Sequence, residues 1–162
     1  MEKEVVKFIR LKQERIKIEG WEQLSASAIS TPYDTANLVE PFLKEADREM
    51  MLVIGLDTKN KPTVISIVAM GTLNQSTVST REVFKPLLLS NSIRFIVVHN
   101  HPSGNTNPSK NDLKFTHKLK KAGDMMEIYL LDSIIYGDSI IYGDSIRSLL
   151  ANDWGGIDID KI

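Results

Sequence analysis

Apolar runs of strand length recur along the middle of the chain. Met50–Leu56, Val64–Ala69 and Ile93–Val98 are almost continuously apolar, and Met126–Leu131 is a further strand candidate. Turn-forming residues at Asp57–Lys61 separate the first two runs and predict an antiparallel pair. The run at Ile93–Val98 predicts a central strand that is buried on both faces of a sheet.

Three segments between these runs carry apolar residues at helical spacing. Thr31 is the predicted N-cap of the first helix and Pro32 its first helical position, and Pro41 is expected to kink this helix or displace its start. Ser79–Glu82 fits a capping box at the start of the second helix. Gly123 is the predicted C-cap of the third. The apolar stripes consist of Leu38, Val39, Phe42, Leu43 and Ala46, of Val83, Phe84, Leu87 and Leu88, and of Leu113, Phe115, Leu119 and Ala122.

The chain is predicted to divide into an N-terminal arm at residues 1–30, one domain at residues 31–150 and a C-terminal tail at residues 151–162. The spacing of apolar residues in the arm fits a helix about as well as a strand. The small residues of Ser25–Ser30 predict a linker into the domain. Within the domain, Gly71–Val78 is a short, more polar strand candidate.

The hexapeptide SIIYGD occurs twice, at Ser133–Asp138 and Ser139–Asp144, and Ser145 with Ile146 starts a third copy. A period of six residues can indicate a β-solenoid, but a solenoid needs at least three units to bury a continuous core. The Gly-Asp pair between the two copies favours a local strand, turn and strand instead.

Together these elements predict the α/β (α+β) fold class. Helices from about Thr35, Thr80 and Lys110 are expected to pack on the faces of a mixed, largely antiparallel sheet. The 162 residues, of which 42% are hydrophobic and 25% charged, suffice for one domain with a substantial core.

Composition narrows the possible chemistry. The formal net charge is −1, from 20 basic and 21 acidic residues, so direct DNA binding is not supported by charge. The chain has no cysteine, which excludes disulfides, thiolate nucleophiles and the cysteine-ligated zinc of nucleobase deaminases. The N-terminus has no apolar segment long enough for a signal peptide or a membrane span, and we therefore expect a cytoplasmic protein without a membrane partner.

The candidate chemistry lies in the segment HNHPSGNTNPSKND, which directly follows the predicted central strand. It contains two of the three histidines, His99 and His101, and residues two apart in an extended chain face the same side. Asp112 is the best candidate for a third ligand, because two prolines and a glycine in the intervening loop can fold the chain back. Such a set could hold Zn²⁺ through nitrogen and oxygen donors, with a fourth position open to water.

Two other interpretations account for the same residues. A pair of loop histidines is more often polar surface than a metal site. Ser109 and Asp112 also fit a helix N-terminus, with Ser109 as N-cap and Asp112 in the first turn, where the helix dipole favours an acid. This second interpretation is compatible with metal binding, since Asp112 could lie in the first turn and still point at the metal. The third histidine, His117, is predicted as a solvated helix position on a different face.

The conjunction H-x-H-P-x6-S-x-x-D fits the JAMM (MPN+) metalloprotease motif without a gap, and the surrounding sequence resembles a narrower family, the RadC-like JAB domain proteins. The resembling segments extend over roughly Asp34–Asp138 and include DREMMLVIGLDTKN, GTLNQS, REVFKPLLLSNS and LLDSIIYGD. The resemblance implies a JAMM/MPN (cytidine-deaminase-like) architecture. The chain departs from the family pattern at Ser133, where the family has a histidine, and in the duplicated SIIYGD.

The resemblance also implies roles for five residues. His99, His101 and Asp112 correspond to the zinc ligands, and Ser109 to the serine that assists at the oxyanion or the bound water. Glu49 corresponds to the general base. Glu49 directly precedes a predicted apolar strand, and this position gives only weak independent support for a catalytic role. Its charged neighbours in the sequence would by themselves favour an exposed surface residue.

The function expected from the resemblance is zinc-dependent hydrolysis of amide or isopeptide bonds in a protein or peptide substrate. The alternative is a DNA-repair accessory or protein-interaction module that keeps the fold without peptidase turnover. The sequence carries no basic stripe or interleaved aromatic residues for direct contact with DNA. Cleavage of peptides that is lost on Glu49→Gln would contradict the alternative.

Overall fold

The computed structural model of the chain describes residues 26–71, 78–137 and 146–150. Most of the predicted N-terminal arm, nearly all of the polar strand candidate after Gly71, the second SIIYGD copy and the predicted tail lie outside these residues.

The described residues form one five-stranded mixed sheet in the order β2-β1-β3-β4-β5. β1 pairs antiparallel with both β2 and β3, β3 runs parallel to β4, and β4 pairs antiparallel with β5. The predicted mixed, largely antiparallel sheet is therefore confirmed, with β3 in its centre. The strands are β1 (Met50–Leu56), β2 (Pro62–Met70), β3 (Arg94–Asn100), β4 (Tyr129–Tyr136) and β5 (Ile146–Ser148).

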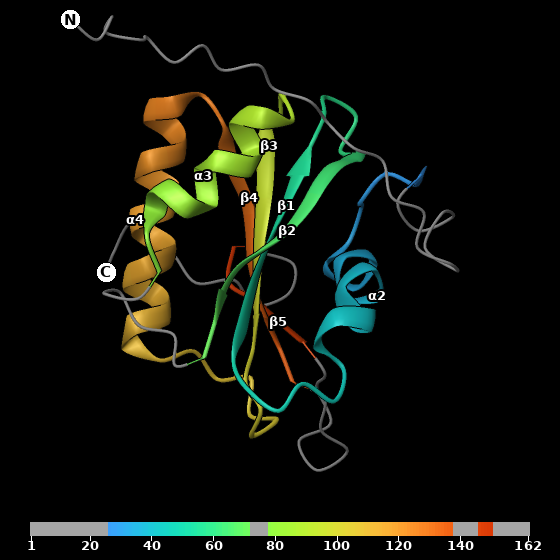
Figure 1. Cartoon of the computed structure of the whole chain (residues 1–162), viewed down its shortest axis with the longest axis vertical. Helices are drawn as coiled ribbons and strands as arrows, with labels where there is room; N and C mark the ends of the chain where they lie inside the picture. Colours follow the sequence, from blue (N-terminus) through green and yellow to red (C-terminus); the bar gives the residue numbers. More distant parts are fainter. Residues whose placement is uncertain (1–25, 72–77, 138–145, 151–162) are drawn as a thin grey trace, which may run out of the picture.

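Helices cover both faces of the sheet (Figure 1). α2 (Pro32–Leu43) lies on one face, and α3 (Thr80–Leu89) and α4 (Lys110–Met126) lie on the other. Alternate residues of β3 enter the two cores: Ile96 packs in the core under α2, and Phe95 packs in the core under α3 and α4. A strand that is buried on both faces must be apolar at every position, which is why its sequence is a continuous apolar run.

The first helix begins as its sequence predicts. Thr31 is the N-cap of α2, where it forms a capping box with Asp34, and Pro32 is the first helical residue. The helix thus starts earlier than Thr35, and Pro41 lies inside its last turn. Just before the cap, Ile29 is buried and its N–H donates to the Asn60 carbonyl at 2.9 Å. The end of the predicted linker is therefore part of the core.

The predicted capping box at α3 is wrong. The helix starts at Thr80 as expected, but the Ser79 side chain makes no capping hydrogen bond. The Glu82 N–H instead donates to the Ser79 backbone carbonyl at 3.0 Å, and the exposed Glu82 carboxylate lies 4.0 Å from Arg81. The backbone carbonyl therefore satisfies the donor that the serine hydroxyl was predicted to satisfy.

The prediction that Gly123 caps α4 is also wrong, and so is the start of the following strand. α4 continues to Met126, its C-cap is Glu127 in the left-handed conformation with φ 56°, and β4 begins at Tyr129. Gly123 is glycine because the chain returns across it. A β-carbon there would lie 2.5 Å from the Ile128 carbonyl oxygen.

The first SIIYGD copy lies at the end of β4, and β5 pairs antiparallel with it, Tyr136 opposite Ile146. The buried carboxylate of Asp132 connects the two strands, because it accepts the Ser148 hydroxyl at 2.7 Å and the Leu150 N–H at 3.1 Å. Burial raises the pKa of Asp132 even though these hydrogen bonds oppose the shift. The Gly-Asp turn and the second copy, which the predicted strand, turn and strand would use, lie outside the described residues.

Among the helices that the structure describes, none is both long enough and apolar enough to cross a membrane.

We expect Gly123→Ala to lower the free energy of unfolding by about 1 to 2 kcal/mol, although alanine favours helices by about 1 kcal/mol, because overpacking typically costs about 1–3 kcal/mol. Urea denaturation measures the change. Lys121→Ala at an exposed position of the same helix is the control and should stay within about 0.5 kcal/mol of the wild type. Equal stability of Gly123→Ala and the wild type would contradict the close approach.

Candidate metal centre

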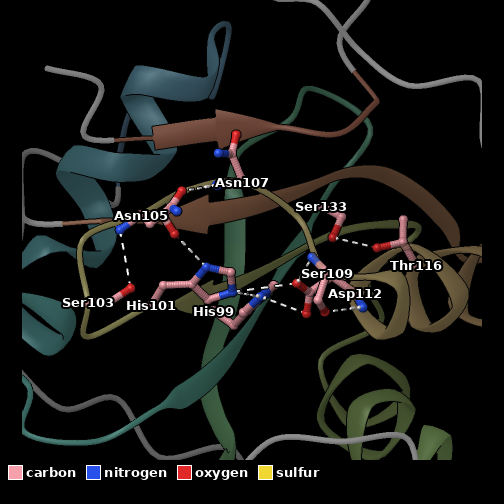
Figure 2. Close-up of polar contacts among 9 residues, drawn as sticks. All are labelled: His99, His101, Ser103, Asn105, Asn107, Ser109, Asp112, Thr116 and Ser133. Atoms are coloured by element: carbon pink, nitrogen blue, oxygen red, sulfur yellow. Dashed lines mark hydrogen bonds and ion pairs between the residues drawn. The ribbon is translucent and has the colours of Figure 1, made fainter. Parts of the chain in front are cut away.

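The two motif histidines lie at the end of the central strand and point to the same place (Figure 2). His99 follows Phe95 at a spacing of four residues, so strand alternation directs its imidazole toward the face covered by α4. The Nε2 atoms of His99 and His101 are 3.1 Å apart. The side chain of His99 is 6% exposed and that of His101 is 17% exposed.

Asp112 reaches the histidines from the first turn of α4. Its Oδ1 lies 3.2 Å from His99 Nε2, and its Oδ2 lies 3.5 Å from His101 Nε2. Asp112 also forms a capping box with Ser109: Ser109 N–H donates to Asp112 Oδ2 at 2.7 Å, and Asp112 N–H donates to Ser109 Oγ at 3.1 Å. The first-turn position and the position beside the histidines therefore coexist in one side chain.

The hydrogen bonds of His101 assign its tautomer. Its Nδ1 lies 2.7 Å from the Asn105 carbonyl oxygen, which can only accept, so Nδ1 carries the proton. In the neutral ring, the form that binds a metal, the Nε2 lone pair then faces His99 and Asp112. The backbone N–H of His101 donates to the Tyr136 carbonyl at 2.9 Å and holds the residue against β4.

The loop between the histidines and α4 turns tightly. Gly104 N–H donates to the His101 carbonyl at 2.8 Å, and Gly104 has a positive φ of 80° that glycine adopts readily. Asn107 N–H donates to the Asn105 side chain at 3.0 Å. The loop packs against Gly137, where a β-carbon would lie 2.6 Å from the Gly104 carbonyl oxygen. These contacts fix the loop that brings Asp112 back to the strand end.

The ionisable groups of the cluster shift one another's pKa values. The Asp112 hydrogen bond is the main cause that raises the pKa of His101 above its ordinary value, against the effect of burial. Burial alone would raise the pKa of Asp112, but the hydrogen bonds with His101 and His99 hold it well below its ordinary value. Asp112 is therefore an ionised carboxylate, as a metal ligand must be.

The donor atoms fit a zinc ion. One ligand atom from each of His99, His101 and Asp112 lies within 4.8 Å of the others. A tetrahedral zinc with bonds of about 2.0 to 2.2 Å separates two donors by roughly 3.3 to 3.6 Å. The contacts of 3.1, 3.2 and 3.5 Å in this cluster are close to that spacing. Two imidazoles and one carboxylate also form a donor set typical of catalytic zinc, which keeps a fourth position open.

Glu49 lies beside this cluster, although it is 50 residues before His99 in the sequence. β1 and β3 are antiparallel with Met51 opposite His99, so the start of β1 meets the end of β3. After Asp112, whose hydrogen bond is the main cause, the charge of Glu49 also contributes to the raised pKa of His101. The resemblance had already named Glu49, and the pairing of the two apolar runs is what brings it beside the histidines.

Glu49 also lines an open hollow of about 390 Å³ next to the histidines. The other residues of its wall are Asp47, Arg48, Gly71 and Pro102. Pro102 directly follows His101, so this hollow adjoins the motif loop. A second hollow, of about 360 Å³, lies beside Asp132, and no residue of 99–112 lines it.

Three further residues lie near the motif. Asn100, which the motif leaves without a role, is buried and its side chain bonds to the backbone on both sides of Glu49. His117 is half-buried rather than solvated, and its Nδ1 has no hydrogen-bond partner among the described residues. Ser133, where the resemblance leads one to expect a histidine, is buried and accepts a hydrogen bond from the Thr116 hydroxyl at 2.9 Å (Figure 2).

The sequence matches the family model described as RadC-like JAB domain over residues 29–149. The chain belongs to this family. A UPF0758 protein of Methanosarcina mazei is 40% identical over 121 residues, which cover 75% of this RadC-like chain and 53% of the relative. A UPF0758 protein of Clostridium botulinum (strain Loch Maree / Type A3) is 46% identical over 109 residues, which cover 67% and 48%. The RadC-like chain thus spans about half the length of the curated relatives that it matches.

Loss of one imidazole should abolish metal binding. We expect the wild type to hold about one Zn²⁺ per chain after reconstitution and dialysis, and His101→Ala to hold far less, because two donors remain where a zinc site needs three. Elemental analysis measures the content. His117→Ala removes the histidine outside the cluster and should keep the wild-type content. Equal zinc in the wild type and His101→Ala would make the site assignment wrong.

Proposed function

We propose that this RadC-like chain is a zinc-dependent hydrolase of the JAMM type that acts on amide or isopeptide bonds in a protein or peptide substrate. The observation that carries the proposal is the convergence of His99, His101 and Asp112 beside a hollow with Glu49 in its wall. The family supports the class, and the curated relatives carry no activity in their names.

His99, His101 and Asp112 would hold the zinc ion through Nε2, Nε2 and the carboxylate. A zinc ion in such a site supplies a Lewis acid for the scissile carbonyl and lowers the pKa of a coordinated water to about 7. The chain contributes the orientation of the donors. The Asn105 carbonyl fixes the ring of His101, and the cap at Ser109 fixes the carboxylate of Asp112.

Glu49 is the proposed general base and acid. A carboxylate at the edge of the hollow accepts the proton of the attacking water and returns it to the leaving amine. The negative charge of Glu49 contributes to the raised pKa of His101, after the larger effect of the Asp112 hydrogen bond, and this supports the proposal. Without such a transfer the amine would have to leave as an anion, which is why an amide hydrolase needs this group.

Ser109 is the proposed oxyanion donor. Its Oγ accepts the Asp112 N–H at 3.1 Å, so the proton of the hydroxyl remains to be donated to another oxygen. A hydroxyl held by a helix cap is preorganised, and preorganised donors are the main source of electrostatic stabilisation in acyl transfer. Ser109 would thus serve the helix with its lone pair and the reaction with its proton.

The wall of the hollow favours a peptide over a nucleic acid as substrate. Arg48 is the basic side chain in that wall, and both of its hydrogen bonds, at 2.8 and 2.7 Å, go to the neighbouring Asp47. The pair leaves little net positive charge to attract phosphates. The described site therefore offers no observation that favours an accessory role in direct contact with DNA.

Glu49→Gln should remove hydrolysis and keep the metal. We expect the rate of peptide cleavage to fall by about 10² to 10⁴, the usual contribution of general acid–base catalysis, with zinc content unchanged. Screening a peptide and isopeptide library with the zinc-loaded protein measures the rate. Glu82→Gln, an exposed glutamate on α3, is the matched control. Cleavage that survives in Glu49→Gln would show that another group moves the proton.

Ser109→Asn separates the two tasks of the serine. Asparagine also caps helices, so we expect the melting temperature to stay near that of the wild type while kcat falls by about 10² to 10³. Ser109→Ala removes both functions and should also lose about 1 kcal/mol of stability. Thermal denaturation and steady-state kinetics measure the two effects. Wild-type kcat in Ser109→Asn would leave the hydroxyl with its capping role alone.

A further inference from the structure

We propose that Asn100, the residue between the two histidines, is a positioning residue that holds Glu49 at the metal centre. The inference rests on the proposed function for the role of Glu49, and on the hydrogen bonds of Asn100 for the positioning. Asn100 is 3% exposed, so its amide must find its partners inside the protein.

The side chain of Asn100 forms hydrogen bonds with the peptide groups on both sides of Glu49. Its Oδ1 accepts the N–H of Met50 at 2.6 Å, and its Nδ2 donates to the carbonyl of Arg48 at 3.0 Å. Both bonds join residues about fifty positions apart in the sequence. The backbone of Glu49 is thereby tied to the strand that carries the metal ligands.

The side-chain amide of Asn100 takes the place of backbone hydrogen bonds between β1 and β3 beyond the end of their register. The register between β1 and β3 ends with Met51 opposite His99, and the N–H of His101, two residues further on, donates to Tyr136 in β4. The segment before β1 would therefore lose its partner on this side. Asn100 restores one donor and one acceptor through its side chain, in the manner of a backbone ladder.

The opposite side of the same segment is held by β2. The Gly71 N–H donates to the Glu49 carbonyl at 2.8 Å, just beyond the pairing of Met50 with Met70. Glu49 thus lies between a backbone bond from β2 and the side-chain bonds of Asn100. These contacts fix the backbone of Glu49, and the fixed backbone sets the position from which its carboxylate extends into the wall of the hollow.

Strand alternation explains why the residue between the ligands can do this. His99 and His101 point to the face under α4, and Asn100 points to the other face with Ile96 and Val98. Asn100 is therefore no ligand, because its amide lies on the far side of the strand from the imidazole of His99. One strand end positions two ligands with alternate residues and the proposed base with the residue between them.

Asparagine is suited to this task by its two kinds of polar atom. Aspartate could accept the Met50 N–H but would oppose the Arg48 carbonyl with a second acceptor, and alanine would satisfy neither. We expect Asn100→Ala and Asn100→Asp to keep zinc binding, since all three ligands remain, and to lower kcat by about 10- to 100-fold, as a base displaced by about an ångström does.

The decisive comparison is the double variant. If Asn100 acts through Glu49, Glu49→Gln with Asn100→Ala should be no slower than Glu49→Gln alone, whereas independent effects would multiply. Ser92→Ala is the matched control: it removes a buried hydroxyl that bonds to Thr63 at 2.7 Å at the opposite end of the sheet. This control should lower stability without changing kcat. A kcat of Asn100→Ala equal to that of the wild type would overturn the inference.

A second readout needs no substrate. We expect the visible absorption of the Co²⁺-loaded protein to change with pH, and Glu49→Gln and Asn100→Ala to shift the midpoint of that change in the same direction. The double variant should match Glu49→Gln. Amide hydrogen exchange should also become faster at Met50 in Asn100→Ala, because that N–H loses its acceptor.

The two readouts separate the two proposals. Matching Co²⁺ shifts in a protein that cleaves no peptide would refute the proposed function and keep the positioning role. Cleavage that depends on Glu49 together with a wild-type midpoint and kcat in Asn100→Ala would keep the function and refute the positioning role. An unchanged midpoint in Glu49→Gln would place Glu49 away from the metal and refute the positioning role as well.

Discussion

The antiparallel pairing of β1 with β3 is the constraint on which the site depends. Met51 lies opposite His99, so the beginning of one buried strand meets the end of the other. His99 in β3 and His101 directly after it point their imidazoles to one place, and Glu49 lies beside them just ahead of β1. Groups on the ends of rigid, buried strands hold their geometry better than groups on free loops. The apolar core is thus also what aligns the polar site.

A helix N-terminus completes the cluster from the other layer. Asp112 accepts the Ser109 N–H and faces both imidazoles with the same carboxylate. The positive end of the α4 dipole favours an ionised acid in the first turn, and so do the histidines. Capping and metal ligation require the same ionised, inward-pointing side chain, so they reinforce each other. The interpretation of Asp112 as a capping residue and its interpretation as a ligand therefore do not exclude each other in this fold.

At several positions the role of a residue depends on backbone contacts, and predictions from the local sequence pattern were wrong there. Gly123 is a residue type that often ends helices, but here it lies inside the helix, where its lack of a side chain lets the backbone of Ile128 pack against it. Gly137 does the same for the loop at Gly104. Ser79 has the spacing of a capping box but leaves the Glu82 donor to its backbone carbonyl. In each case the deciding neighbour or geometry is not encoded in the few residues that form the pattern.

The sequence by itself determined the strand and helix order and the ligand candidates. Periodicity and the short spacing from His99 to Asp112 are local, and local chemistry suffices for them. The resemblance named Glu49, but only the tertiary structure shows how Glu49 reaches that site and that Asn100 is bonded on both sides of it. Their contacts join positions about fifty residues apart, and a spacing motif carries no information on which strand pairs with which. Strand register supplies that information, because it depends on the packing of the whole sheet.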